Sequence, residues 1–109
     1  MRMDDDRAFR ALASPARRRV LALVRDEPRS VTELASALGV SQPAASQHLA
    51  TLRDAGLVTV ERDGRRRVYR PDLATLEQLR SFFDGYWNDA LDRLDRAALT
   101  ALGDRRVAS

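Results

Sequence analysis

The stretch that most constrains the fold is residues 41–70, SQPAASQHLATLRDAGLVTVERDGRRRVYR. Ser41 is a typical helix N-cap, and it precedes apolar positions that share one face at 100° per residue: Ala45, Leu49, Leu52 and Gly56. Two strand-length runs, 57–62 and 65–70, then flank the dipeptide Asp63-Gly64, which is a strong signal for a tight hairpin. We therefore predict a short helix with one buried face, followed at once by a two-stranded ribbon.

The preceding residues predict three further helices. Asp4 to Asp6 can cap and charge a helix that ends near Leu12, and Ser14-Pro15 then starts a second helix, which runs to about Asp26. Ser30 to Glu33 has the spacing of a capping box and opens a third helix, which Gly39 ends after Leu38. The inward-facing residues of these helices are expected to be Ala8, Phe9, Leu12, Val20, Leu21, Val24, Leu34 and Leu38. The short turn between the third helix and Ser41 has helix-turn-helix spacing.

The hairpin is expected to turn through a two-residue loop at Asp63-Gly64. That loop would set the cross-strand pairs Val58 with Tyr69, Val60 with Arg67, Arg62 with Arg65, and Glu61 with Arg66. One face of the ribbon would then be apolar at its base and basic at its tip, and Glu61 would neutralise part of the charge of Arg66.

A long final helix is predicted from Asp72 to about Leu102. At 1.5 Å per residue it would be a rod of roughly 45 Å, longer than one small domain can cover. Its apolar stripe therefore predicts a second copy of the chain as partner. The residues expected at this dimer interface are Leu76, Leu79, Phe83, Trp87 and Leu94. The aromatic cluster Phe82, Phe83, Tyr86 and Trp87 could instead line a ligand pocket, but aromatic residues at this spacing more often form core or dimer contacts.

Positive charge is concentrated in the first part of the chain. All 19 basic residues are arginine, against 16 acidic residues. Residues 1–70 hold 14 arginines and nine acidic residues, whereas residues 71–109 hold five and seven, so the net charges are +5 and −2. Residues 1–70 are therefore the part of the chain expected to bind a polyanion. The absence of lysine has a neutral explanation in codon bias, so the position of each arginine must decide its role.

The helix that begins at Ser41 is predicted to read duplex DNA. Its exposed face is short and mostly uncharged near its N-terminus. The residues expected to contact bases or phosphates are Ser41, Gln42, Ala44, Ser46, Gln47 and His48. Glutamine can make two hydrogen bonds to adenine, and serine or histidine can bond a base or a phosphate. The alternative is a solvated helix face, with His48 packed or hydrogen-bonded under the ribbon.

The arginines at the ribbon tip are predicted to contact the DNA backbone or a minor groove: Arg62, Arg65, Arg66 and Arg67. The alternative is that they protect an edge strand from aggregation, but three consecutive arginines exceed what that role needs. Arg17 to Arg19 and Arg53 could also contact DNA, but a solvated helix face explains these arginines equally well.

Several function classes are not supported by the residues. The chain has no cysteine, no apolar run near the ~18 residues of a membrane helix, and three aspartates where a targeting segment would be apolar or acid-free. It shows no nucleophile with a base, no paired catalytic carboxylates, and no phosphate-binding glycine loop. We expect a soluble cytoplasmic protein without enzyme activity, cofactor, metal or membrane partner.

In this order, the segments FRALASPARRRVLALV at 9–24, VTELASALGVSQPAASQHLATLRDAGLV at 31–58 and RDGRRRVYR at 62–70 resemble the ArsR-type winged helix-turn-helix repressors. The tail FFDGYWNDALDRL at 82–94 is similar to the SdpR-type autorepressor branch. The resemblance implies a homodimer that represses from an inverted-repeat operator in response to a signal.

The sequence departs from the metal-sensing members of that family. Their thiolate pair would fall near Ser30 and Thr32, which are not soft ligands, and the last helix has no histidine for their other site. The only histidine, His48, lies on the predicted reading helix. If a signal exists, we expect a small organic ligand near the aromatic cluster or a partner protein.

We therefore predict a mainly α fold, a single winged helix-turn-helix domain over 1–109 with its DNA-binding core at 14–70 and its dimerisation helix at 72–102. The predicted function is a sequence-specific DNA-binding regulator, most simply a homodimeric repressor. The alternative is a winged-helix module that binds protein or RNA and does not read DNA sequence.

Overall fold

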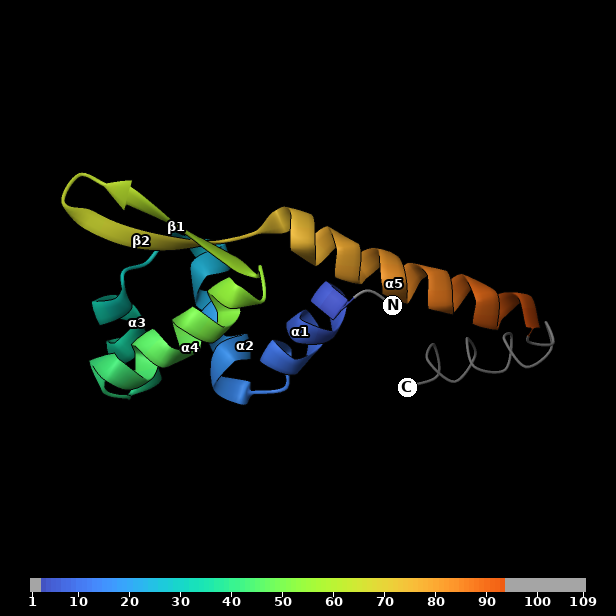
Figure 1. The fold of residues 1–109 in the computed structure, drawn as a ribbon, viewed down its shortest axis with the longest axis horizontal. Helices are drawn as coiled ribbons and strands as arrows, with labels where there is room; N and C mark the ends of the chain where they lie inside the picture. Colours follow the sequence, from blue (N-terminus) through green and yellow to red (C-terminus); the bar gives the residue numbers. More distant parts are fainter. Residues whose placement is uncertain (1–2, 94–109) are drawn as a thin grey trace, which may run out of the picture. The chain divides into compact units, whose positions relative to one another are not determined.

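The computed structural model describes residues 3–93, with side-chain surroundings from Asp5 onward. Five helices and one hairpin follow one another along the chain (Figure 1). Their bounds are α1 Met3–Leu12, α2 Pro15–Asp26, α3 Val31–Leu38, α4 Gln42–Asp54, β1 Val58–Asp63, β2 Arg66–Pro71 and α5 Leu73–Arg93. The predicted mainly α winged helix-turn-helix is confirmed. The expected continuation of the last helix to Leu102, including Leu94, lies outside the described residues.

The predicted starts of α2 and α3 are confirmed by capping contacts, whereas Asp4 to Asp6, expected to cap the first helix, lie within α1. The Ser14 hydroxyl accepts a hydrogen bond from the backbone N–H of Arg17, with Pro15 in the first turn, and Ser30 accepts one from Glu33. Gly39 ends α3 in the left-handed conformation with φ of 69°, which a residue with a side chain adopts only at a cost. Only Val40 and Ser41 then separate Gly39 from α4, so α3 and α4 pack against each other as a helix-turn-helix.

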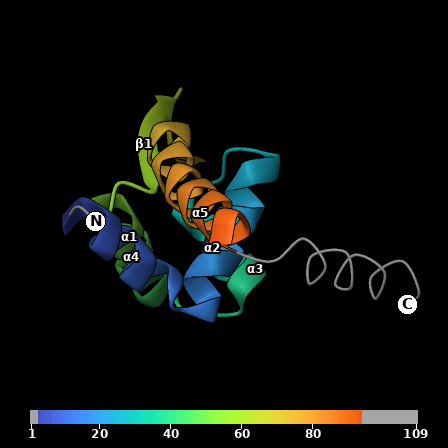
Figure 2. The same cartoon turned by 90° about the vertical axis from the view of Figure 1, so that its right-hand side faces the viewer.

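The core of residues 3–77 lies where α1 to α4 meet the base of the hairpin. Figures 1 and 2 show α1 beside α2 and α4. The fully buried large side chains are Leu34, Leu49, Leu52, Leu57, Val20 and Val24. Ala8 is buried as expected and Ala11 is buried as well, whereas Phe9, Leu12, Leu21 and Leu38 are only half-buried. The predicted inward stripes were therefore right in direction but too wide.

The predicted hairpin register was wrong by two residues. Val60 pairs with Tyr69, Glu61 with Val68, and Arg62 with Arg67, so the turn residues are Gly64 and Arg65. The expected loop would need a positive φ at Asp63 as well as at Gly64, whereas the observed turn places only glycine there, with φ of 65°. The shift by two keeps each residue on its expected face but changes its partner.

The second strand has neighbours on both edges. Besides β1, it pairs with Arg29, which lies between α2 and α3. The backbone N–H of Arg29 donates to the Tyr69 carbonyl at 3.3 Å, and the Tyr69 N–H donates to the Arg29 carbonyl at 2.8 Å. The base of the hairpin is thereby attached to the helical body, with Val58 and Val68 buried.

The chain divides into two compact units, residues 1–77 and 78–109. The first contains the helix-turn-helix, the hairpin and the first residues of α5. Asp72 starts α5 by accepting hydrogen bonds from the N–H groups of Ala74 and Thr75. Within the described residues, the second unit consists of α5 from Gln78 to Arg93.

Candidate nucleic-acid interface

Helix α4 is held from one side and exposed on the other. The Ser41 hydroxyl caps it by accepting from the Ala44 N–H at 3.2 Å. Its inward residues Ala45, Leu49 and Leu52 have at most 1% exposed surface. Of the predicted reading residues, four are exposed and two, Ala44 and His48, are half-buried; the exposed ones are Ser41, Gln42, Ser46 and Gln47. Four of the six predicted residues are therefore exposed at the start of α4, where the helix carries no acidic residue and no arginine.

One of these residues is already held by a neighbour. The Gln42 amide nitrogen donates to the Thr32 hydroxyl on α3 at 2.6 Å. This contact was not predicted from the sequence, in which Thr32 was notable only as a position where metal sensors carry a ligand. No local pattern could have found it, because the two residues meet only when α3 packs against α4.

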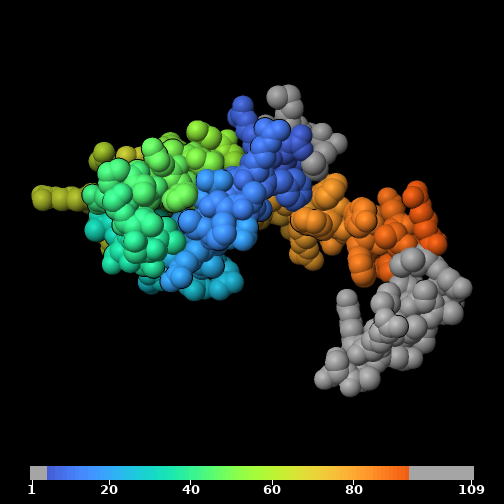
Figure 3. Space-filling view, turned by 90° about the horizontal axis from the view of Figure 1, so that it is seen from below, coloured from blue at the N-terminus to red at the C-terminus, as the bar shows by residue number. Residues whose placement is uncertain are grey.

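The hairpin tip carries the predicted arginine cluster. Arg62, Arg65, Arg66 and Arg67 are all exposed, Arg65 lies in the turn itself, and Arg62 pairs directly with Arg67. Two arginines on opposite strands repel each other, so this tip is favourable only beside negative charge or well solvated. In the space-filling view of Figure 3, the tip projects beyond the surface formed by α3 and α4.

Glu33 of α3 neutralises part of this charge, whereas Glu61 does not take the role that was predicted for it. Glu61 forms an ion pair with Arg70, with 2.7 Å between Oε1 and Nε, and not with Arg66. Arg66 instead forms an ion pair with Glu33 of α3. The register explains the difference, because Glu61 pairs directly with Val68 and so reaches Arg70 diagonally along the face it shares with that residue.

The arginines at the start of α2 have structural partners. The Arg17 Nε donates to the Ala11 carbonyl at 2.7 Å, and an Arg18 nitrogen donates to the Leu12 carbonyl at 2.8 Å. Both therefore satisfy the free carbonyl groups at the end of α1, where a cation is also favoured by the helix dipole. Arg17 is half-buried, so it is not the freely solvated side chain that was considered as an alternative to a DNA contact. Arg53 is exposed in the last turn of α4.

The α5 residues predicted to form a dimer interface differ widely in exposure. Leu79 is buried, Leu76 is half-buried, and Phe83 and Trp87 are 56% and 54% exposed. Tyr86 is 67% exposed, and Phe82 contacts Phe83 edge to face with 5.4 Å between ring centres. Leu94 lies outside the described residues.

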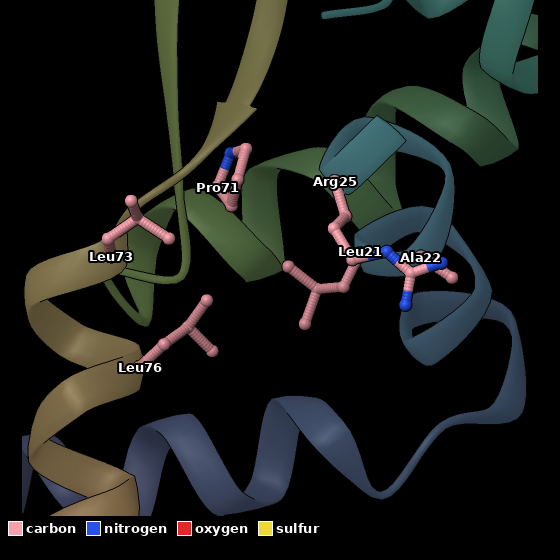
Figure 4. Close-up of a pocket in the computed structure, with 6 residues that line it drawn as sticks. All are labelled: Leu21, Ala22, Arg25, Pro71, Leu73 and Leu76. Atoms are coloured by element: carbon pink, nitrogen blue, oxygen red, sulfur yellow. The ribbon is translucent and has the colours of Figure 1, made fainter. Parts of the chain in front are cut away.

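A cavity of about 390 Å³ lies between α2 and the segment that joins the hairpin to α5. Figure 4 shows its lining, which is apolar apart from one guanidinium: Leu21, Ala22, Arg25, Pro71, Leu73 and Leu76. The volume is within the range of small-molecule pockets. The aromatic side chains that were expected beside a ligand are not among the residues that line this cavity.

Among residues 3–93, no group of three or more histidine or acidic side chains is placed to hold a metal ion. Within the same range, none of the helices combines the length and the apolar character that crossing a membrane requires.

Comparison with known proteins places this arrangement in a family. The profile of the bacterial regulatory proteins of the arsR family matches residues 14–60, which span the helix-turn-helix and the start of β1. The HTH-type transcriptional regulator Rv2034 of Mycobacterium tuberculosis is 45% identical over 86 residues, which are 79% of this chain and 80% of that protein. This chain belongs to the arsR family. It is therefore a winged helix-turn-helix transcriptional regulator.

Two further proteins of known type are similar to this chain. The HTH-type transcriptional repressor SmtB of M. tuberculosis is 51% identical over 62 residues. The match covers 57% of this chain and only 46% of SmtB. A homodimeric winged helix-turn-helix DNA-binding domain, Mb0332 from Mycobacterium bovis, is 30% identical with a TM-score of 0.61. That match covers 85% of this chain and 83% of the other.

Proposed function

We propose that the arsR-family member described here is a homodimeric repressor that binds an inverted-repeat operator in duplex DNA. The observation that carries the proposal is the pairing of two surfaces in one unit: the exposed, uncharged start of α4 and the arginine-rich tip of the hairpin beside it. A helix of this kind can enter a major groove, while a basic ribbon contacts the flanking backbone. The proposal is supported by two similar proteins, since SmtB is a transcriptional repressor and the Mb0332 domain is homodimeric.

The side chains divide into base-reading and backbone-contacting groups. Gln42 and Gln47 each offer a carbonyl and an N–H, which match the donor and acceptor of adenine in the major groove. Ala44 allows close approach, and Ser41, Ser46 and His48 bond bases or phosphates. Arg62, Arg65 and Arg67 neutralise phosphates or enter a narrow minor groove.

The dimer is proposed to form through α5, with help from α1. The domain then comprises a DNA-binding core at 14–70 and a dimerisation helix at 72–102. Trp87 and Tyr86 support this, because large aromatic side chains with more than half of their surface exposed are costly in an isolated chain. If the partner subunit buries the Trp87 side chain, Trp87→Ala should weaken the free energy of dimer formation by a few kcal/mol. Sedimentation should show a dimer for the parent protein and weaker dimerisation for the variant, with weaker DNA binding in parallel.

The proposal predicts the geometry of the operator. Two copies of α4 in successive major grooves require half-sites about 10 bp apart, or a multiple of one helical turn. Selection from a random duplex pool should therefore recover an inverted repeat with that spacing. A direct repeat or a single half-site would contradict the dimeric arrangement.

A salt titration separates this function from a protein- or RNA-binding module. Binding to duplex DNA should weaken as salt rises, with a log–log slope of about −0.9 for each phosphate neutralised. The control is a duplex RNA of the same sequence, whose deep, narrow major groove does not admit side chains for reading. Equal affinity for the DNA and RNA duplexes, or binding that does not depend on salt, would favour the protein- or RNA-binding module. The proposal also implies a cytoplasmic protein without catalytic activity.

A further inference from the structure

Two consecutive residues of α3 each hold one of the side chains predicted to meet DNA. Thr32 accepts a hydrogen bond from the amide of Gln42 on α4. Glu33 forms an ion pair with Arg66 on β2. Helix α3 therefore connects the reading helix α4 to the hairpin through Thr32 and Glu33. Neither side chain has a role in the proposed function.

Glu33 has a second partner that fixes its position. The Ser30 hydroxyl donates to Glu33 Oε1 at 3.1 Å, within the capping box that starts α3. Its carboxylate therefore stays at the start of α3 and keeps Arg66 beside the helical body. A guanidinium paired with a carboxylate neutralises less phosphate charge than Arg62, Arg65 or Arg67, which form no ion pair with the residues that the structure describes.

Thr32 determines which part of the Gln42 amide remains available. Its hydroxyl accepts one N–H, which leaves the carbonyl oxygen and the second N–H for a base. Adenine presents one donor and one acceptor in the major groove, so this pair matches it. Guanine presents two acceptors there, and a carbonyl facing them is repelled.

We propose that Thr32 and Glu33 are positioning residues that set the balance between sequence reading and general DNA affinity. Thr32 holds Gln42 so that it favours adenine over guanine, and Glu33 withholds Arg66 from the phosphate backbone, which limits binding to arbitrary sequences. The inference rests on the proposed function, in which α4 and the hairpin contact DNA.

Glu33→Gln is the sharpest test of the second part. Glutamine can replace glutamate in a capping box, so α3 keeps its start while Arg66 loses its charged partner. We expect tighter binding to scrambled duplexes and a salt slope steeper by about one unit per subunit. The preference for the selected operator should fall, because the added affinity is independent of sequence.

Arg66→Ala, alone and combined with Glu33→Gln, identifies the source of that gain. Alone it should change the slope little, and in the Glu33→Gln background it should abolish the increase. Glu27→Gln is the matched control, since Glu27 is an exposed carboxylate that pairs with Arg29 outside the hairpin. An unchanged slope for Glu33→Gln, or a loss for Arg66→Ala in the parent as large as that for Arg65→Ala, would overturn this part.

Thr32→Val removes the hydroxyl with little change in shape, and Thr32→Ser retains it. The two variants should be compared on operators carrying every single adenine-to-guanine change. We expect Thr32→Val to lose about two- to tenfold of its preference for adenine at one position per half-site. That position should be the one at which Gln42→Ala also loses discrimination, and Thr32→Ser should behave like the parent. Parent-like behaviour of Thr32→Val at every position would overturn this part.

The parent protein in the same titrations distinguishes the two levels of inference. A flat salt slope and no operator preference in the parent would overturn the proposed function together with this inference. A steep, selective parent whose Glu33→Gln and Thr32→Val variants match it would overturn only the role of α3.

Discussion

Helix α4 and the hairpin differ in how they are held and in what they display. Three residues with at most 1% exposure, Ala45, Leu49 and Leu52, fix α4 to the core, and its exposed first turns carry no charge. The hairpin buries Val58 and Val68 at its base, whereas residues 61–67 are all exposed and include four arginines.

This difference implies a division of labour. A helix seated in a close-packed core presents a fixed pattern of donors and acceptors, which is the requirement for reading bases. Charge on an exposed ribbon attracts any phosphate backbone and carries no sequence information by itself. We therefore assign specificity to α4 and general affinity to the hairpin.

The largest effect is expected from the seating of α4. Leu52→Ala should lower the free energy of unfolding by about 2–5 kcal/mol, because a fully buried leucine leaves a cavity when it is shortened. Urea denaturation followed by circular dichroism measures this. Leu73→Ala is the control, since Leu73 is 72% exposed and its loss should change stability little. Equal losses for both would show that α4 is not fixed by the core.

Gln47→Ala should weaken binding to the selected operator by about 1–3 kcal/mol and leave binding to scrambled duplexes nearly intact. The physical reason is that a base-edge contact is lost while phosphate contacts remain. Fluorescence anisotropy on both duplexes provides the comparison, with Gln78→Ala on α5 as the matched control. A similar loss on both duplexes would remove Gln47 from the reading group.

Arg65→Ala and Arg67→Ala should each weaken binding to all duplexes and reduce the salt slope by about one unit per subunit. If either arginine enters a narrow minor groove, its variant should also lose preference for A·T-rich flanking sequence. Arg80→Ala is the control, since Arg80 lies on α5 and forms an ion pair with Asp84. An unchanged slope for the hairpin variants would show that the two elements have been assigned the wrong roles.

Arg17→Ala should destabilise the fold by about 0.5–1.5 kcal/mol, the net value of a typical hydrogen bond, and leave the salt slope unchanged. Its guanidinium satisfies the end of α1, and that role does not involve a phosphate. Thermal unfolding and a salt titration of the same preparation measure both effects. A decrease of the slope without a change in stability would make Arg17 a DNA contact.

Zinc should have the smallest effect of all, with no change in DNA affinity. The chain has no cysteine and one histidine, so a zinc site would have to be built almost entirely from carboxylates, which suit Mg²⁺ or Ca²⁺ better. Calorimetric titration with zinc, followed by anisotropy, measures it. A stoichiometric, sub-micromolar site that releases DNA would make metal the signal after all.

The elements that the sequence predicted well are those decided by neighbouring residues. The caps at Ser14, Ser30 and Ser41 and the left-handed end at Gly39 depend on side chains within three or four positions of the helix terminus. The hairpin itself was equally clear. Its register was not, because a glycine can be the first or the second turn residue, and the choice depends on which backbone twist fits the strands.

What could not be predicted depends on contacts between distant segments. The ion pair of Glu33 with Arg66 and the hydrogen bond of Gln42 with Thr32 form only after α3 has packed beside α4 and the hairpin. The half-buried position of Arg17 has the same origin, since it depends on where the end of α1 lies relative to α2. Periodicity and charge counts contain no information about such pairs.

The paired backbone groups of Arg29 and Tyr69 have a consequence for how the protein opens. They close a loop that contains residues 30–68, and therefore all of α3, α4 and β1. Breaking these two hydrogen bonds would separate the hairpin from the helical body, and we expect this to happen only when the whole unit unfolds. The Tyr69 amide should therefore exchange its hydrogen with solvent only on unfolding of the unit. The amides of the turn at Gly64 and Arg65 should exchange orders of magnitude faster. The reading helix and the base of the hairpin would then be gained or lost as one cooperative unit, while the tip moves independently.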